Sequence, residues 1–192
     1  MCIFRVDVGL LVRKTIFCDR YGMPSSLRGG IKQTGAGRIL FWRGGGVWIG
    51  RAEESADFHS HHAIQITLAL SQGKLRFRCP DEDWKNYSAA IIPAHQIHAF
   101  EARGELVALI FTEPESREGQ AIRARFCEEI AALCDETILP DIANLADAYS
   151  RGCADQVLID CSRVLIASLA KNTPLPAAPL DQRITRAIDL LH

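Results

Sequence analysis

The chain has 192 residues, of which 48% are hydrophobic and 23% are charged, and its net charge is -1. This length and composition indicate one globular domain with appendages, large enough to build a core without disulfide or metal staples. The near-neutral charge argues against a protein that coats nucleic acid. Seven cysteines without a CxxC pair argue against a disulfide framework or a cysteine zinc site, and predict reduced thiols in a cytoplasmic protein.

Neither a signal peptide nor a membrane span is expected. Arg5 and Asp7 interrupt the apolar start of the chain, and no apolar run approaches the ~18 residues that a span needs. Residues 1–36 are expected to be an N-terminal extension, partly disordered, because residues 21–37 are rich in Gly, Ser and Pro.

Residues 37–115 have a sequence pattern typical of β-strands. Two apolar runs, 39–42 and 47–49, flank three consecutive glycines, which predicts a hairpin with the glycines as its turn. Residues 62–70 alternate strictly between apolar and other side chains, and further short strands follow to residue 112. Several short strands with turns at this spacing predict an antiparallel sandwich or barrel.

The period changes to that of a helix after residue 115. Ser116 is a candidate N-cap, and the apolar residues that follow recur about every 3.6 positions, at Ile122, Phe126, Ile130 and Leu133. Further helices are predicted at about 140–149 and 154–170. Residues 173–179 are a Pro-rich linker, and an amphipathic helix without a partner follows at 180–192.

The histidines are the strongest chemical signal. His59 and His61 are two apart on an extended segment, Gln65 has the same parity, and His98 begins a later strand. Such a set can close around one divalent ion, for which zinc, nickel and iron are the candidates. The alternative is a polar pocket, or hydrogen-bonded core histidines, without a metal.

The alternation in residues 62–70 has a second consequence for packing. Ile64, Ile66, Leu68 and Leu70 lie on the face opposite the histidines. If the imidazoles line the interior of a barrel, these four side chains need a cover from outside, since burying each contributes roughly 1.5–3 kcal/mol. The predicted helices supply that cover, within one chain or across a dimer interface.

Two stretches resemble the cupin motifs. His59-Ser-His61 with Gln65 resembles the first motif, in which a Glu normally occupies the place of Gln65. The stretch from Pro93 to His98 resembles the second, with His95 in the place of a Gly. The resemblance implies a mainly β fold with C-terminal helices: a cupin-like antiparallel double-stranded β-barrel over residues 37–115, followed by a helical segment.

The order of barrel, helices, linker and final helix resembles the sensor half of an AraC/XylS-type transcriptional regulator. That resemblance implies that residues 116–172 are a helical segment through which two copies of the chain form a homodimer. Residues 173–192 would then be a linker and the first helix of a helix-turn-helix domain absent from this sequence, through which alone the protein would bind DNA. It also implies a small-molecule effector in the barrel, held by His59, His61, Gln65 and His98 with Trp48 and Phe100 as aromatic walls.

On this interpretation the chain is not an enzyme but an effector-sensing and dimerisation domain. The first alternative is a small metal-dependent cupin enzyme, a dioxygenase or an isomerase, which needs a bound ion with open coordination positions. The second is a metabolite-binding cupin without a DNA-binding partner. The Gln at position 65 favours the sensor, because a neutral ligand retains a cation less well than a carboxylate.

Overall fold

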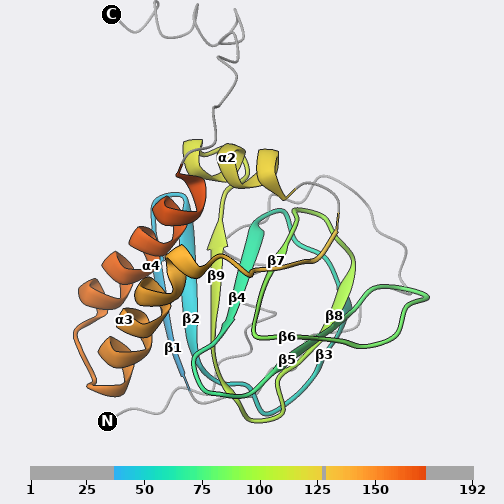
Figure 1. Ribbon diagram of the computed structural model, residues 1–192, viewed down its shortest axis with the longest axis horizontal. Coiled ribbons are helices and arrows are strands. Elements are labelled where there is room, and N and C mark those ends of the chain that lie inside the picture. Colours follow the sequence, from blue (N-terminus) through green and yellow to red (C-terminus); the bar gives the residue numbers. More distant parts are fainter. Residues whose placement is uncertain (1–36, 127–128, 172–192) are drawn as a thin grey trace, which may run out of the picture.

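The computed structural model describes residues 37–126 and 129–171 (Figure 1). The expectations for residues 1–36, the linker and the final helix lie outside these residues. Strands and helices follow in two blocks along the chain, and their bounds are these: β1 Gly37–Trp42, β2 Gly45–Arg51, β3 Ala56–His59, β4 Ile64–Ala69, β5 Leu75–Arg78, β6 Lys85–Tyr87, β7 Ala89–Ile92, β8 His98–Glu101, β9 Leu106–Thr112, α2 Arg117–Arg125, β10 Ala131–Ala132, the 3-10 helix η2 Glu136–Ile138, α3 Leu139–Ser150 and α4 Asp155–Ala170.

The strands form two antiparallel sheets. The larger sheet has the order β1-β2-β9-β4-β7-β10 and the smaller one the order β3-β8-β5-β6. The chain passes repeatedly from one sheet to the other, for example from β2 to β3 and back to β4, which closes the sheets into a barrel. The predicted fold, a barrel of antiparallel strands followed by C-terminal helices, is confirmed.

The hairpin β1–β2 turns at Arg43 and Gly44, and only one of the three consecutive glycines belongs to the turn. Gly44 has φ +87°, which favours glycine. Gly45 and Gly46 instead lie in β2. A Cβ at Gly45 would lie 2.4 Å from the backbone oxygen of Phe111, so β2 and β9 can approach each other there only with glycine at this position.

The outer face of the larger sheet carries the apolar side chains of β4 that needed a cover. Ile64, Ile66 and Leu68 are at most 1% exposed, and they share one core cluster with the apolar faces of the helices. Figure 1 shows α3 and α4 beside this sheet. Helices of the same chain therefore supply the cover, and the helical residues of the cluster are Ile122, Ile138, Leu145, Ala148, Leu158, Leu165, Ile166 and Leu169.

A second core cluster fills the space between the two sheets. Its members are side chains of both sheets that point inward, and the large aromatic ones are Trp48, Phe77, Phe100 and Phe111. Phe77 and Phe100 stack with ring centroids 4.9 Å apart, and each is 1% exposed. The barrel interior thus has a packed aromatic part of its own, separate from the core under the helices.

The predicted first helix is shorter than its apolar period suggests. Ser116 caps α2 as predicted, because its Oγ accepts the N–H of Gly119 at 2.9 Å. However, α2 ends at Arg125, and Ile130 and Leu133 do not lie on it. Ile130 packs on the core between the sheets and Leu133 on the core under the helices, so tertiary contacts override the helical period here.

The two later helices agree with the sequence prediction. The expected helix at about 140–149 is α3, which has Pro140 in its first turn. The expected helix at 154–170 is α4, and Arg38 of β1 bonds both the Asp155 carboxylate and the Cys153 carbonyl at its start. None of the helices in the described part of the chain has the length and apolar character needed to span a membrane.

Candidate metal and ligand site

The four predicted ligand residues come from four segments of the barrel, namely β3, the β3–β4 connection, β4 and β8. His59 is the last residue of β3 and pairs directly with His98, the first residue of β8. His61 lies in the connection from β3 to β4, and Gln65 is the second residue of β4 in the other sheet. The site therefore lies where the two sheets meet.

Three imidazoles converge at this place. The ring centroids of His59 and His98 are 4.3 Å apart, and that of His61 is 5.9 Å from His59 and 5.3 Å from His98. One ring nitrogen from each lies within 4.8 Å of the other two. Two nitrogens bound to one zinc ion are about 3.3 Å apart. Modest side-chain rotations are therefore enough to bring these three nitrogens onto a common ion.

Backbone carbonyls determine which nitrogen of each ring can bind. Nδ1 of His59 donates to the Asp57 carbonyl at 2.7 Å, and Nδ1 of His61 donates to the Ala63 carbonyl at 2.7 Å. Nδ1 of His98 donates to the Gln96 carbonyl at 2.9 Å. In a neutral imidazole the hydrogen then resides on Nδ1, so Nε2 carries the lone pair. Protein metal sites orient their histidines by the same kind of second hydrogen bond.

His98 gives the clearest sign of a missing partner. Its side chain is fully buried, and Nε2 has no hydrogen-bond partner among the described residues. A buried polar atom without a partner costs about 1–3 kcal/mol, which proteins rarely tolerate without a reason. A cation at the centre of the three imidazoles would satisfy this nitrogen.

The surroundings of His61 and His98 keep these two imidazoles neutral. Burial, reinforced by the charge of His59, lowers the pKa of His61 to about 4. Burial also lowers the pKa of His98 well below its usual value, and the charges of His59 and His61 act in the same direction. Metal ions bind the neutral form of imidazole, so two of the three histidines are ready to bind at neutral pH.

Gln65 touches the site through His61. Its Oε1 lies 2.8 Å from His61 Nε2, and its Nε2 donates to the Thr67 hydroxyl at 2.7 Å. Oε1 and the lone-pair nitrogen of His61 repel each other unless a cation lies between them or the amide turns to donate. Gln65 can thus serve as a fourth ligand, or hold His61 in place when no ion is bound.

The aromatic residues around the imidazoles differ in part from those predicted. Phe77 lies 5.8 Å from His98, and Phe111 meets His61 edge-on at 5.5 Å, both measured between ring centroids. Neither was predicted as a site residue, although strand alternation places Phe77 on the inward face. Trp48 and Phe100 are 2% and 1% exposed and belong to the packed core between the sheets.

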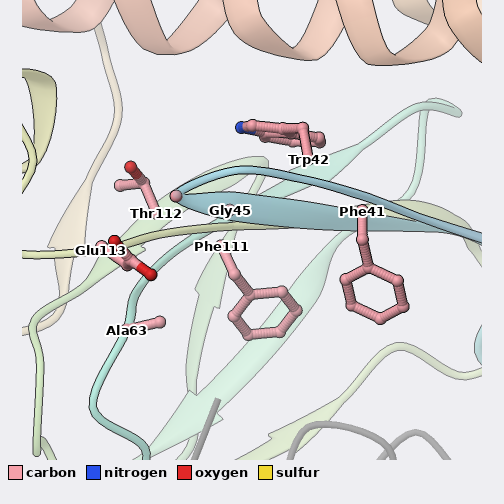
Figure 2. Close-up of a pocket in the computed structure, with 8 residues that line it drawn as sticks. Phe41, Trp42, Gly45, Ala63, Phe111, Thr112 and Glu113 are labelled. Carbon is pink, nitrogen blue, oxygen red and sulfur yellow. The ribbon is translucent and has the colours of Figure 1, made fainter. Parts of the chain in front are cut away.

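A small recess opens beside this aromatic group, next to the turn of the β1–β2 hairpin. Its volume is about 80 Å³, well below the ~300–1,000 Å³ of typical drug-sized ligand sites. Figure 2 shows the rings of Phe41 and Phe111 on one side of the hairpin and Trp42 on the other. Through Phe111, the recess borders His61. It suits a molecule of a few heavy atoms.

The comparisons with known proteins give structural neighbours only. No family model and no curated protein matches the sequence. The AraC-like transcriptional activator CuxR is 13% identical, with a TM-score of 0.46, over 88% of this chain and 68% of CuxR. A cupin-like protein of Thermotoga maritima is 15% identical, with a TM-score of 0.37, over 68% of this chain and 96% of its own.

The EutQ protein of Clostridium difficile is a third similar structure. It is 14% identical, with a TM-score of 0.36, over 50% of this chain and 83% of its own. Because the identities are so low, the chemistry of this chain has to follow from its own residues.

Proposed function

We propose that the chain is the effector-sensing and dimerisation part of a transcriptional regulator. In this proposal, residues 37–115 hold a small molecule at the histidine site, and the helical residues 116–172 pass the binding event to a second copy and to a DNA-binding domain outside this sequence. The observation that carries the proposal is the buried Nε2 of His98, which has no partner within residues 37–126 and 129–171 and lies among three converging imidazoles.

The composition of the site supports binding rather than catalysis. Among the described residues, the cluster that can hold a metal contains three histidines and no carboxylate. Gln65, the polar side chain in contact with His61, cannot act as an acid or a base. When all three imidazoles hold an ion, no acid or base remains among these four side chains, so the site can hold a ligand firmly without converting it.

The same composition indicates what the guest would be. Three neutral imidazoles and an amide leave the full positive charge of a divalent ion uncompensated. Such a centre attracts an anionic oxygen donor, for which a small carboxylate or oxyanion is the simplest form.

The dimer surface we propose is the outward side of α4. Val157 and Val164 are 42% and 52% exposed, and the half-buried Cys161 lies between them at helical spacing. The opposite side of α4 covers the sheet that contains β4. A second copy that packs on the exposed side would therefore be one helix away from the strand that bears Gln65.

Metal and guest analysis of the purified protein tests the site. We expect about one equivalent of zinc, nickel or iron in protein prepared without chelator, and a small anion that native mass spectrometry detects only while the metal is present. His98→Leu should lose both. If the wild-type protein takes up none of the three metals when they are added, the proposal is wrong.

Light scattering tests the dimer. Val164→Glu should convert dimers to monomers, whereas Asn86→Glu, which adds the same charge to exposed strand β6, should not. A wild-type chain that stays monomeric at high concentration would exclude the dimer.

A metal-dependent cupin enzyme, a dioxygenase or an isomerase, is the second candidate, and the imidazole cluster itself favours it. An ion held by three imidazoles keeps open positions where a substrate can bind. Turnover of small carboxylates or sugar phosphates by the metal-loaded protein would select this candidate. Tight binding of the same compounds without turnover would select the sensor.

A further inference from the structure

A second group of histidines lies on the surface of the barrel, outside the site described above. His62 belongs to the β3–β4 connection and His95 to the β7–β8 connection, while Glu115 lies between β9 and α2. His62 Nδ1 lies 3.1 Å from His95 Nε2, and His62 Nε2 lies 3.0 Å from a carboxylate oxygen of Glu115. His95 and Glu115 are exposed and His62 is half-buried, so the group is open to solvent.

We propose that His62 and His95 form a second divalent transition-metal site, with Glu115 as the residue that orients His62. The proposal does not depend on the buried site. Paired imidazoles that are open to solvent suit Cu²⁺, Ni²⁺ and Zn²⁺.

The hydrogen bond to Glu115 decides which nitrogen of His62 faces His95. A carboxylate only accepts, so His62 Nε2 donates to it and Nδ1 carries the lone pair. The arrangement of carboxylate, histidine and lone-pair nitrogen is the one that orients histidine ligands in metal sites. His95 completes the pair when its hydrogen resides on Nδ1, because its Nε2 lone pair then faces that of His62.

The spacing of the two nitrogens fits a common ion. Two nitrogens about 2.1 Å from one ion and 3.1 Å apart subtend about 95° at the ion. This angle is close to the right angle of square and octahedral geometry, which Cu²⁺ and Ni²⁺ prefer. The ion can therefore enter without a change of backbone.

The backbone at His95 gives an independent reason to look for a function here. His95 has φ +64°, in the left-handed region where glycine is the favoured residue. Its N–H donates to the His61 carbonyl at 2.8 Å, which holds the strained loop against the segment that carries His61. A bulky side chain kept in a strained conformation is often retained for what the side chain does.

Copper titration in a His98→Leu background tests the proposal, because that background disables the buried site. We expect one equivalent of Cu²⁺ to remain bound, with an electron paramagnetic resonance signal from two nitrogen ligands. Adding His95→Gly should lower the affinity at least tenfold while relieving the backbone strain, so the loss cannot come from unfolding. Adding Glu115→Ala should lower it by about tenfold.

Asp81→Gly is the matched control, since Asp81 has φ +62°, is exposed, and is not a histidine. It should relieve the same kind of strain and leave Cu²⁺ binding unchanged. If the His98→Leu protein and its His95→Gly derivative bind Cu²⁺ equally, the second site does not exist. A failure of the buried site would appear instead as equal binding by the wild type and His98→Leu.

Discussion

The two faces of strand β4 contribute to the molecule in opposite ways. On the outer face, Ile64, Ile66 and Leu68 are buried against helices and satisfy every requirement of a stable core. On the inner face, Gln65 and Thr67 are equally buried but polar, and the neighbouring His98 has a ring nitrogen without a partner in the part of the chain that the structure describes. The outer face thus contributes to stability, whereas the inner face carries the polar side chains of the site that we propose binds a ligand.

The largest difference between the faces should appear when the outer core is damaged. Leu165→Ala removes a fully buried side chain of α4 and should cost about 2–5 kcal/mol of unfolding free energy. Denaturant unfolding in chelator measures this cost. Arg163→Ala, at an exposed position of the same helix, should change stability by less than about 0.5 kcal/mol. Equal costs for the two variants would contradict the assignment of this core.

The inner face should respond in the opposite way. His98→Leu removes a proposed metal ligand and puts an apolar side chain where Nε2 has no partner among the described residues, so the metal affinity of the buried site should fall about 100-fold or more. In chelator the variant should be at least as stable as the wild type, because the buried polar atom is gone. Isothermal titration and thermal melts give the two values. A clear loss of stability in chelator would show that His98 has a structural role.

Gln65→Glu tests how strongly the side chain at position 65 affects the binding of a cation. A carboxylate beside His61 reduces the net charge of the ion and its ligands, so zinc affinity should rise roughly tenfold. The chelator-treated variant should be less stable, since it buries a charge. Thr67→Val, which removes the partner of the Gln65 amide, is the comparison variant and should not increase affinity.

The free energy of unfolding of the metal-free protein should also depend on pH, because folding buries His61 and His98. We expect this effect to be smaller than those of the substitutions above. Burial lowers the pKa of His61 to about 4 and that of His98 well below its usual 6.5. The unfolded chain therefore binds more protons than the folded one between about pH 6.5 and 4, and stability should fall as the pH decreases through this window. His98→Leu should flatten part of this dependence. An unchanged slope would mean that the pKa of His98 is the same in the folded and unfolded states, which would contradict its lowering by burial.

Local patterns predicted most of the elements but fewer of their ends. The alternation at residues 62–70 and the period at residues 154–170 correspond to β4 and α4, because each element buries one regular apolar face. Beyond Arg125, Ile130 and Leu133 continue the helical period, yet they pack on two different cores. A period in sequence cannot reveal that successive apolar residues belong to separate clusters.

The sequence also predicted which histidines lie close together. His59, His61 and His98 were expected to meet, and their ring nitrogens lie within 4.8 Å of one another. Phe77 and Phe111 were not expected beside them, and Trp48 and Phe100 pack in the core between the sheets. Strand parity gives the face on which a side chain lies, but the register between sheets decides which side chains meet there.

By itself, therefore, the sequence determined that the chain forms a barrel of short strands with helices after it, and that histidines of one parity oppose an apolar face. Both follow from the periodicity of local structure. Only the tertiary structure decided that the helices of the same chain cover that face, that three carbonyls turn the Nε2 lone pairs toward a common place, and that His62 and His95 meet on the surface. These outcomes depend on contacts between segments far apart in sequence, and local patterns carry no information about such contacts.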